Sequence, residues 1–160
     1  MALTIGTDAY DSVDNIVAYW SDRGNTAWAA LTTEQAEIYI RQATDWVDRT
    51  FAFTGEQASG MQRLKWPRKY VYLNSHAVED TTIPWQLKEA VAVTADLFRL
   101  GTFDMDGIVT NDAAVTMEKV DVITVTYDAQ SKLRGGVIPS NVYQLLRPLT
   151  GASSGGLLRA

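Results

Sequence analysis

Residues that could carry out catalysis are scarce in this chain of 160 residues. Its single histidine, His76, has no nucleophile beside it in the sequence. Histidine is the usual general base, but we interpret this one as a surface or loop residue. The chain has no cysteine, which excludes disulfides, thiolate metal sites and cysteine nucleophiles. No phosphate-binding glycine loop or zinc-protease motif occurs. We therefore expect no catalytic centre and no cofactor.

Two acidic groups resemble fragments of functional sites. Residues 104–107 read Asp-Met-Asp-Gly, which resembles the start of a calcium loop. The EF-hand template needs glycine at its sixth position and glutamate at its twelfth, whereas here glycine is fourth and Val115 is twelfth. Asp45 and Asp48 lie three residues apart on a predicted helix, where paired carboxylates could do acid–base work. This spacing is also typical of the solvated face of an amphipathic helix, which we favour, and we expect no metal site.

A basic run is the most informative stretch of the sequence. Residues 62–69 read Gln-Arg-Leu-Lys-Trp-Pro-Arg-Lys, with four cations around a Trp–Pro pair. Proline restricts the residue before it to extended backbone, so we expect a short helical turn over 61–65 to stop here. Trp66 is then a structural pin for the run, whose cations could touch phosphates or pair with an acidic protein. The candidate partner contacts in this run are Arg63, Lys65, Trp66, Arg68 and Lys69.

The overall charge limits the kinds of partner. The formal net charge is −5 and the pI is about 4.8. Nucleic-acid binders usually show clustered positive charge, and here only the basic run does. Tight, specific DNA binding is therefore not favoured, whereas an acidic protein that lets DNA slide past is compatible with this composition. The N-terminus has no signal-peptide pattern, and no apolar run is long enough to span a bilayer, so we expect no membrane contact.

Periodic apolar residues predict a mainly α fold. They indicate helices over about 13–23 and 84–100, a helix from a Thr32–Gln35 capping box to about Arg49, and a short helix after Pro139. We expect the tryptophans on these helices to be mostly core: Trp20, Trp46 and Trp85. Together the helices predict a small bundle with extended termini.

The remaining segments predict little regular structure. Residues 70–83 read as irregular, whereas 115–127 alternate β-favouring types. Residues 115–127 therefore predict a minor strand or hairpin, whose partner could be a neighbouring copy. We expect one domain over residues 1–149 and a flexible tail over 150–160. The tail ends in an apolar tip with a cation, and its candidate partner contacts are Leu157, Leu158 and Arg159.

Several blocks, in this order and spacing, carry a family resemblance. They are Ala18-Tyr-Trp20 with Arg23-Gly24, Ile40 to Asp48, Gln62-x-Leu64-x-Trp66-Pro67-Arg68, Ile83-Pro84, Lys119 to Tyr127, and Ile138-Pro139 with Leu145-Leu-Arg-Pro148. The chain resembles a tailed-phage family catalogued as putative DnaT-like single-stranded DNA-binding proteins, whose phage members resemble head–tail connectors, or adaptors. The resemblance covers most of the chain.

The resemblance implies a structural virion protein. Such proteins resemble adaptors that form a homo-oligomeric ring, usually dodecameric, between the portal protein and the tail terminator or stopper. Double-stranded DNA would pass through the ring without specific binding, along a channel lined by acidic helices. The location implied is the neck of the virion, after assembly in the host cytoplasm. The tail would dock on the portal or on an adjacent copy. The alternative implied by the catalogued label is a replication protein that binds single-stranded DNA.

Overall fold

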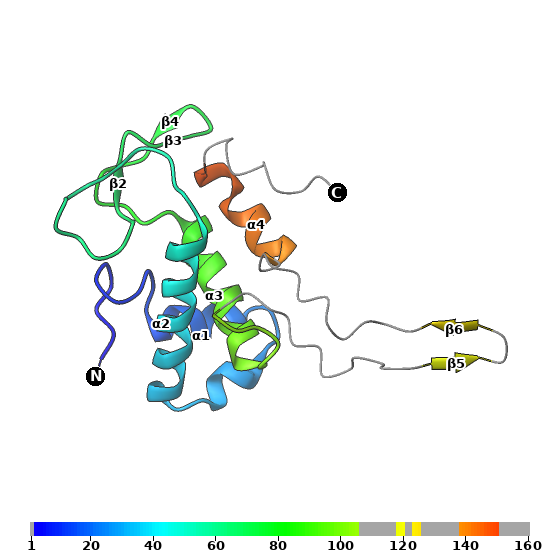
Figure 1. Cartoon of the computed structure of the whole chain (residues 1–160). Helices are drawn as coiled ribbons and strands as arrows, with labels where there is room; N and C mark the ends of the chain where they lie inside the picture. The colour runs from blue at the N-terminus through cyan, green and yellow to red at the C-terminus, as the bar shows by residue number, and fades with distance from the viewer. Residues whose placement is uncertain (1, 106–117, 121–122, 126–137, 151–160) are drawn as a thin grey trace.

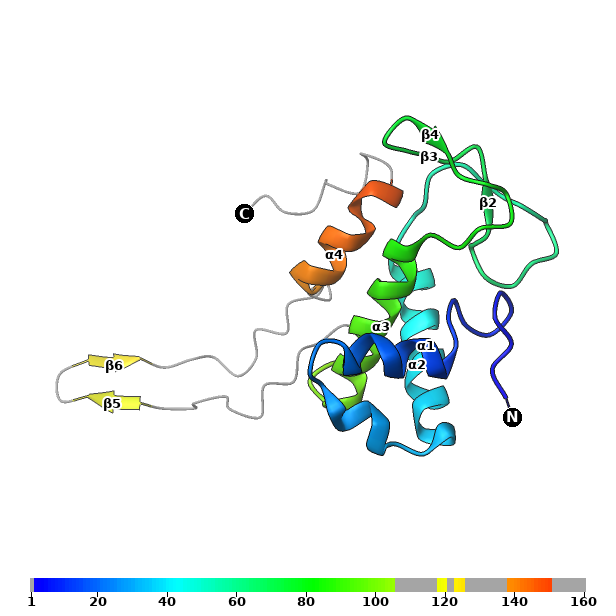
Figure 2. The ribbon, with the colours of Figure 1, turned by 180° about the vertical axis from the view of Figure 1, so that it is seen from behind.

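The computed structural model of the chain describes residues 2–105, 118–120, 123–125 and 138–150. Within these residues the fold is mainly α, as predicted (Figures 1 and 2). The helices are α1 (Val13–Ser21), α2 (Thr33–Thr50), α3 (Trp85–Arg99) and α4 (Ser140–Leu146), with 3-10 turns η1 (Thr26–Ala30) and η2 (Arg147–Leu149). Helix α3 packs against both α2 and α4, so it forms the centre of the bundle.

The helix starts follow the sequence signals. The Ser12 side chain accepts a hydrogen bond from the backbone of Asn15 and caps α1. Thr32 and Gln35 form the predicted reciprocal capping box at the start of α2. Gly24 follows α1 with a φ of 76°, a left-handed conformation that suits glycine at a helix end.

A small β lobe, defined here as residues 53–78, corrects the prediction for this region. It contains β1 (Glu56–Gln57) antiparallel to β2 (Arg68–Lys69), and β3 (Tyr72–Leu73) antiparallel to β4 (His76–Ala77). The expected irregular segment 70–83 therefore holds a hairpin, and the expected helical turn over 61–65 is a set of bends. Strands of two residues are too short for an alternating pattern to reveal them.

The minor strand or hairpin predicted near 115–127 is confirmed as a pair of short strands. Strands β5 (Glu118–Val120) and β6 (Ile123–Val125) pair antiparallel with each other. The strand therefore finds a partner within its own chain and does not depend on a neighbouring copy for it. Both views place the hairpin away from the helices (Figures 1 and 2).

The core is rich in aromatic residues, and one of the tryptophans predicted to be in the core lies outside it. Trp28 and Trp66 are fully buried, Trp46 is nearly so, and half-buried Trp20 donates its indole N–H to the Ala92 carbonyl. Trp85 is 61% exposed, although its position on a helix predicted a core residue. The reason is that Trp85 begins α3, where the neighbouring turn that would cover it is missing.

Some predictions fall outside the described residues. The tail residues Leu157, Leu158 and Arg159 lie there, as do Gly107 and Val115 of the calcium-loop comparison. Among the helices that the structure describes, none is both long and apolar enough to cross a membrane.

Candidate nucleic-acid interface

The Trp66–Pro67 pair fixes the basic run to the body of the protein. The indole of Trp66 is 0% exposed and packs edge-on against Phe53, with ring centroids 5.9 Å apart. Its backbone N–H donates to the hydroxyl of Tyr10, at 3.3 Å. The burial agrees with the expected pin, and it means that the Trp66 ring offers no surface to a partner.

Asp48 is the second part of this anchor. It accepts a hydrogen bond from the Tyr10 hydroxyl and, at 2.9 Å, one from the backbone N–H of Lys65. Burial raises the pKa of Asp48, while these hydrogen bonds act to lower it. Burial and the neighbouring carboxylate also raise the pKa of Tyr10. Asp48 therefore corrects the prediction of a solvated carboxylate, because it joins α2 to the basic run.

Arg68 acts as a clamp inside the β lobe. Its guanidinium donates to the carbonyls of Thr54 at 2.7 Å, Gly55 at 2.6 Å, Lys65 at 3.1 Å and Phe53 at 3.3 Å. Partial burial lowers the pKa of Arg68. A planar group with five donors can join several carbonyls at once, so Arg68 organises the lobe from within.

Two further cations of the run also bind within the chain. The ammonium of Lys65 donates to the Phe51 carbonyl at 2.8 Å. The guanidinium of Arg63 lies 3.2 Å from a carboxylate oxygen of Asp8 and 3.7 Å from one of Asp45. Lys69 makes no ion pair within the part of the chain that the structure describes. The basic run is thus less of a positive patch than its sequence predicted.

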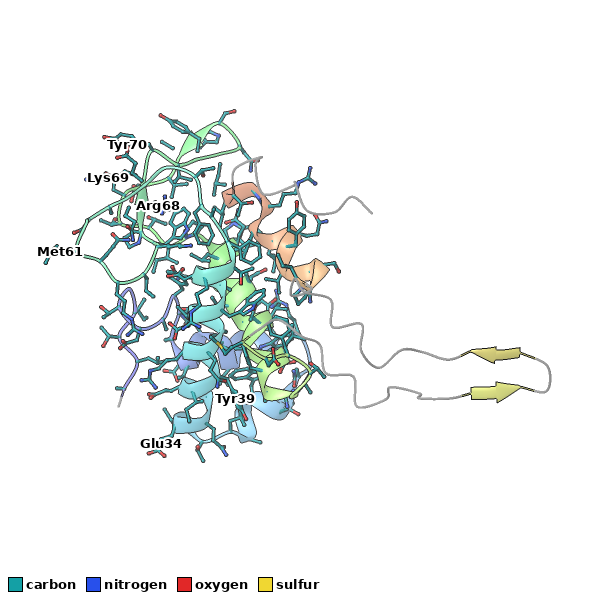
Figure 3. All side chains as sticks on the ribbon, viewed as in Figure 1. Glu34, Tyr39, Met61, Arg68, Lys69 and Tyr70 are labelled. Carbon is teal, nitrogen blue, oxygen red and sulfur yellow. The ribbon has the colours of Figure 1, made fainter. Side chains whose placement is uncertain are left out.

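The surface of the lobe is aromatic and apolar instead. Met61 is 96% exposed, Tyr70 71% and Tyr72 66%, and His76 is exposed on β4. Figure 3 places Met61, Lys69 and Tyr70 along the outer edge of the lobe. Exposed tyrosines close to a lysine offer flat faces for stacking together with a charge for phosphate.

Tyr70 has an unusual backbone. Its φ is 61°, in the left-handed region that bulky residues rarely adopt. Such strain persists where the surroundings impose it, and it concentrates at functional sites. Here the fixed β2 strand before Tyr70 and buried Val71 after it hold the residue, so the ring is directed outward. In the sequence, this surface is marked by two tyrosines on either side of an apolar valine. A search for clustered charges does not find it.

Other kinds of site find little support in the geometry. Among the described residues, no three His, Asp or Glu side chains gather as a metal site. The exposed His76 pairs with Leu73 across the hairpin and has no hydrogen-bonded nucleophile in the described region. The candidate interface is therefore a binding surface: Tyr70 and Tyr72 with Lys69, and Met61 on the same outer edge of the lobe.

Comparison with known proteins gives one match. A family model described as "Putative DnaT-like ssDNA binding protein" matches residues 2–160, which is all but the first residue. No curated protein and no solved structure matches the chain. The family description names binding to single-stranded DNA and gives no support to a head–tail adaptor role.

Proposed function

Because the chain belongs to the family of putative DnaT-like ssDNA-binding proteins, we propose that it binds single-stranded DNA through the outer face of the β lobe. The observation that carries this proposal is the exposed, conformationally strained Tyr70 next to Lys69. Tyr70 and Tyr72 would stack on successive bases, and Lys69 would contact the phosphate between them.

Stacking has to supply most of the binding energy in this proposal. Three cations of the basic run are engaged within the chain, and the net charge is −5. Single-strand binding without base-specific hydrogen bonds tolerates many sequences, because every base has a flat face. We therefore expect moderate affinity, little sequence preference and weaker binding to duplex DNA, whose bases are already stacked. This role needs no catalysis, and we propose that the chain is not an enzyme.

Fluorescence anisotropy with a labelled oligodeoxythymidine tests the proposal. Loss of one stacked base costs about 1–3 kcal/mol, so Tyr70→Ala and Tyr72→Ala should each weaken binding about 5- to 150-fold. Trp85→Ala is the matched control, because it removes an equally exposed aromatic from another surface. Unchanged affinity in both tyrosine variants would refute the proposed site, and no binding by the wild-type protein at low salt would refute the function.

A head–tail adaptor is the second candidate function, and the β5–β6 hairpin favours it. The hairpin is a two-stranded sheet, so each strand has one edge unpaired within that sheet. Isolated hairpins are marginally stable, and open edges are templates for another strand. Neighbouring copies could pair there to form a ring between the portal and a tail terminator or stopper, at the virion neck.

Particle mass distinguishes this second function from the first. The protein mixed with portal should form a ring-sized complex in light scattering after size exclusion. Thr124→Pro should prevent it by removing a backbone donor from β6. If no complex formed on the portal at any ratio, the adaptor role would fail, while binding to single-stranded DNA would be unaffected.

A further inference from the structure

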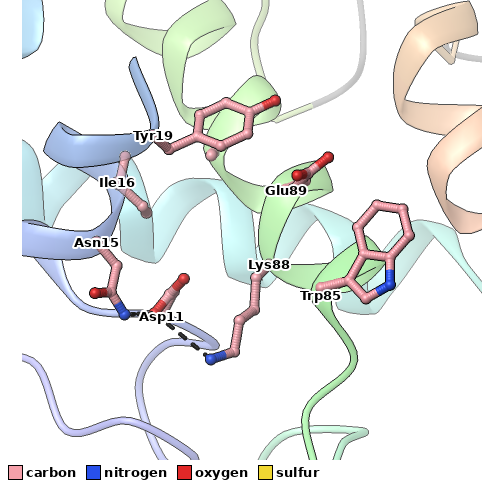
Figure 4. A pocket seen from close by; sticks show the side chains of 8 residues that line it. Asp11, Asn15, Ile16, Tyr19, Trp85, Lys88 and Glu89 are labelled. Atoms are coloured by element: carbon pink, nitrogen blue, oxygen red, sulfur yellow. Dashed lines mark hydrogen bonds and ion pairs between the residues drawn. The ribbon is translucent and has the colours of Figure 1, made fainter. Parts of the chain in front are cut away.

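A groove between α1 and α3 is not used by the proposed function. It has a volume of about 180 Å³ and is lined by residues from both helices and the segment before α1. Its apolar part comes from Ile16, Ala92 and Trp85, and its polar part from Asp11, Lys88 and Glu89 (Figure 4). A hollow with an apolar floor and charged groups at its rim can bind a segment that carries both apolar and charged side chains.

Trp85 adds exposed apolar surface to the groove. Its indole is 61% exposed at the first residue of α3, although large aromatics usually bury most of their surface. Figure 4 shows the ring at one side of the hollow, with Glu89 and Lys88 between it and α1. An exposed indole beside an apolar floor is typical of a docking surface.

The rim favours a cation. The Lys88 ammonium is already paired, 3.8 Å from a carboxylate oxygen of Asp11. The Arg23 guanidinium lies 3.5 Å from Glu89 and 3.5 Å from the centre of the Tyr19 ring. The Asp11 carboxylate also accepts from the Ser12 backbone N–H and the Asn15 side chain, so Glu89, which pairs with Arg23, is the rim carboxylate better placed to accept another donor. An open indole face attracts a guanidinium.

The end of the chain has the matching chemistry. Residues 157–159 are Leu-Leu-Arg, after a Gly/Ser-rich stretch. The last described residues are held against the β lobe: Thr150 bridges to Phe53, and the Leu149 carbonyl accepts the backbone N–H of Thr54 at 3.0 Å. Both overall views place this end of η2 beside the start of α3 (Figures 1 and 2). The seven residues from Thr150 to Leu157 can span up to about 25 Å.

We propose that residues 157–159 dock in the α1–α3 groove of the same molecule. The two leucines cover Trp85 and the apolar floor, and the Arg159 guanidinium lies at the Glu89 carboxylate. A short Gly/Ser-rich tether gives its tip a high effective concentration, so a weak contact is sufficient. Docking would remove an exposed aromatic from solvent and would place the C-terminus on the helical body.

Acrylamide quenching of tryptophan fluorescence tests this proposal, because Trp85 is the most exposed indole among the described residues. We expect the chain truncated after Thr150 to be quenched more steeply than the full chain. Leu157→Asp/Leu158→Asp should behave like the truncation. Ser153→Asp/Ser154→Asp is the matched control, since it adds the same charge to the tether and leaves the tip intact, and it should behave like the wild type.

The Trp85→Phe variant tests whether the difference in quenching comes from the tryptophan in the groove. In this background the difference between full and truncated chains should disappear. Equal quenching of the full and truncated wild-type chains would overturn the proposal, and so would a difference that persists in Trp85→Phe. Light scattering completes the test by measuring the oligomeric state. If Trp85 were protected from acrylamide only when the full chain dimerises, the tail would come from a second copy. That result would overturn docking within one molecule. None of these results depends on DNA binding.

Discussion

Gly55 lies close against the backbone of Lys69 within the β lobe. A Cβ at this position would lie 2.2 Å from the Lys69 carbonyl oxygen and 2.8 Å from a methyl of Val71, and the φ of 73° is itself unfavourable for other residues. We expect Gly55→Ala to lower the free energy of unfolding by about 2–4 kcal/mol in urea denaturation. It should also weaken DNA binding, because β2 positions Tyr70.

Gly60 provides the control for this substitution. A Cβ there meets nothing within 4 Å. Gly60→Ala should therefore leave stability within about 0.5 kcal/mol of the wild type. If both alanine variants were equally stable, the close approach of residues 55 and 69 would be wrong.

The Tyr10 hydroxyl has two hydrogen-bond partners: it donates to the half-buried Asp48 and accepts from the buried backbone N–H of Trp66. Tyr10→Phe leaves both without that partner, which should cost about 2–4 kcal/mol. Tyr19→Phe, which keeps the ring that contacts Arg23, should cost much less.

The cost of Tyr10→Phe should depend on pH. The pKa of Asp48 is already raised by burial, so folding penalises its ionised form relative to the unfolded chain. Loss of the Tyr10 hydrogen bond raises this pKa further. A raised carboxyl pKa reduces stability as pH increases from the unfolded value toward the folded one, so the deficit of Tyr10→Phe should grow as pH rises above about 4. A deficit that shrank over this range would contradict an ionised Asp48 accepting from Tyr10.

At the scale of elements, the β3–β4 hairpin has a tight turn that can be improved. Asn74 and Ser75 have φ values of 50° and 67°. Both positions of such a two-residue turn favour Asn–Gly, so Ser75→Gly should stabilise the chain by about 0.5–1 kcal/mol. Ser75→Val should destabilise it, because a β-branched residue resists positive φ. Thermal unfolding of the three proteins checks the order, and a stabilising valine would contradict the turn geometry.

The helices could be predicted from the sequence and the β lobe could not, for a physical reason. Ser12 and the Thr32–Gln35 box act locally, and helical periodicity repeats over several turns. The lobe is held by long-range bonds, above all those from Arg68 to residues 53–55. Short strands carry no period that a sequence pattern could reveal. Of the four cations that predicted a surface patch, Arg63, Lys65 and Arg68 bind within the chain.

At the scale of the whole molecule, charge sets how DNA binding depends on salt. The net charge is −5, and the candidate interface offers Lys69, with Arg63 already near Asp8 and Asp45. Each phosphate neutralised on a single strand contributes about −0.7 to the slope of log K against log salt. One or two contacts therefore predict a slope of about −0.7 to −1.4. Anisotropy titrations over a range of salt concentrations measure it directly.

The slope also identifies the surface that binds. Lys69→Ala should reduce its magnitude by about 0.7, whereas Tyr70→Ala should lower affinity without changing the slope, because stacking releases no counterions. Lys88→Ala is the control cation, since Lys88 lies in the α1–α3 groove and pairs with Asp11. A wild-type slope several times steeper would require more cations than the β lobe presents, and DNA would then have to bind another face of the molecule.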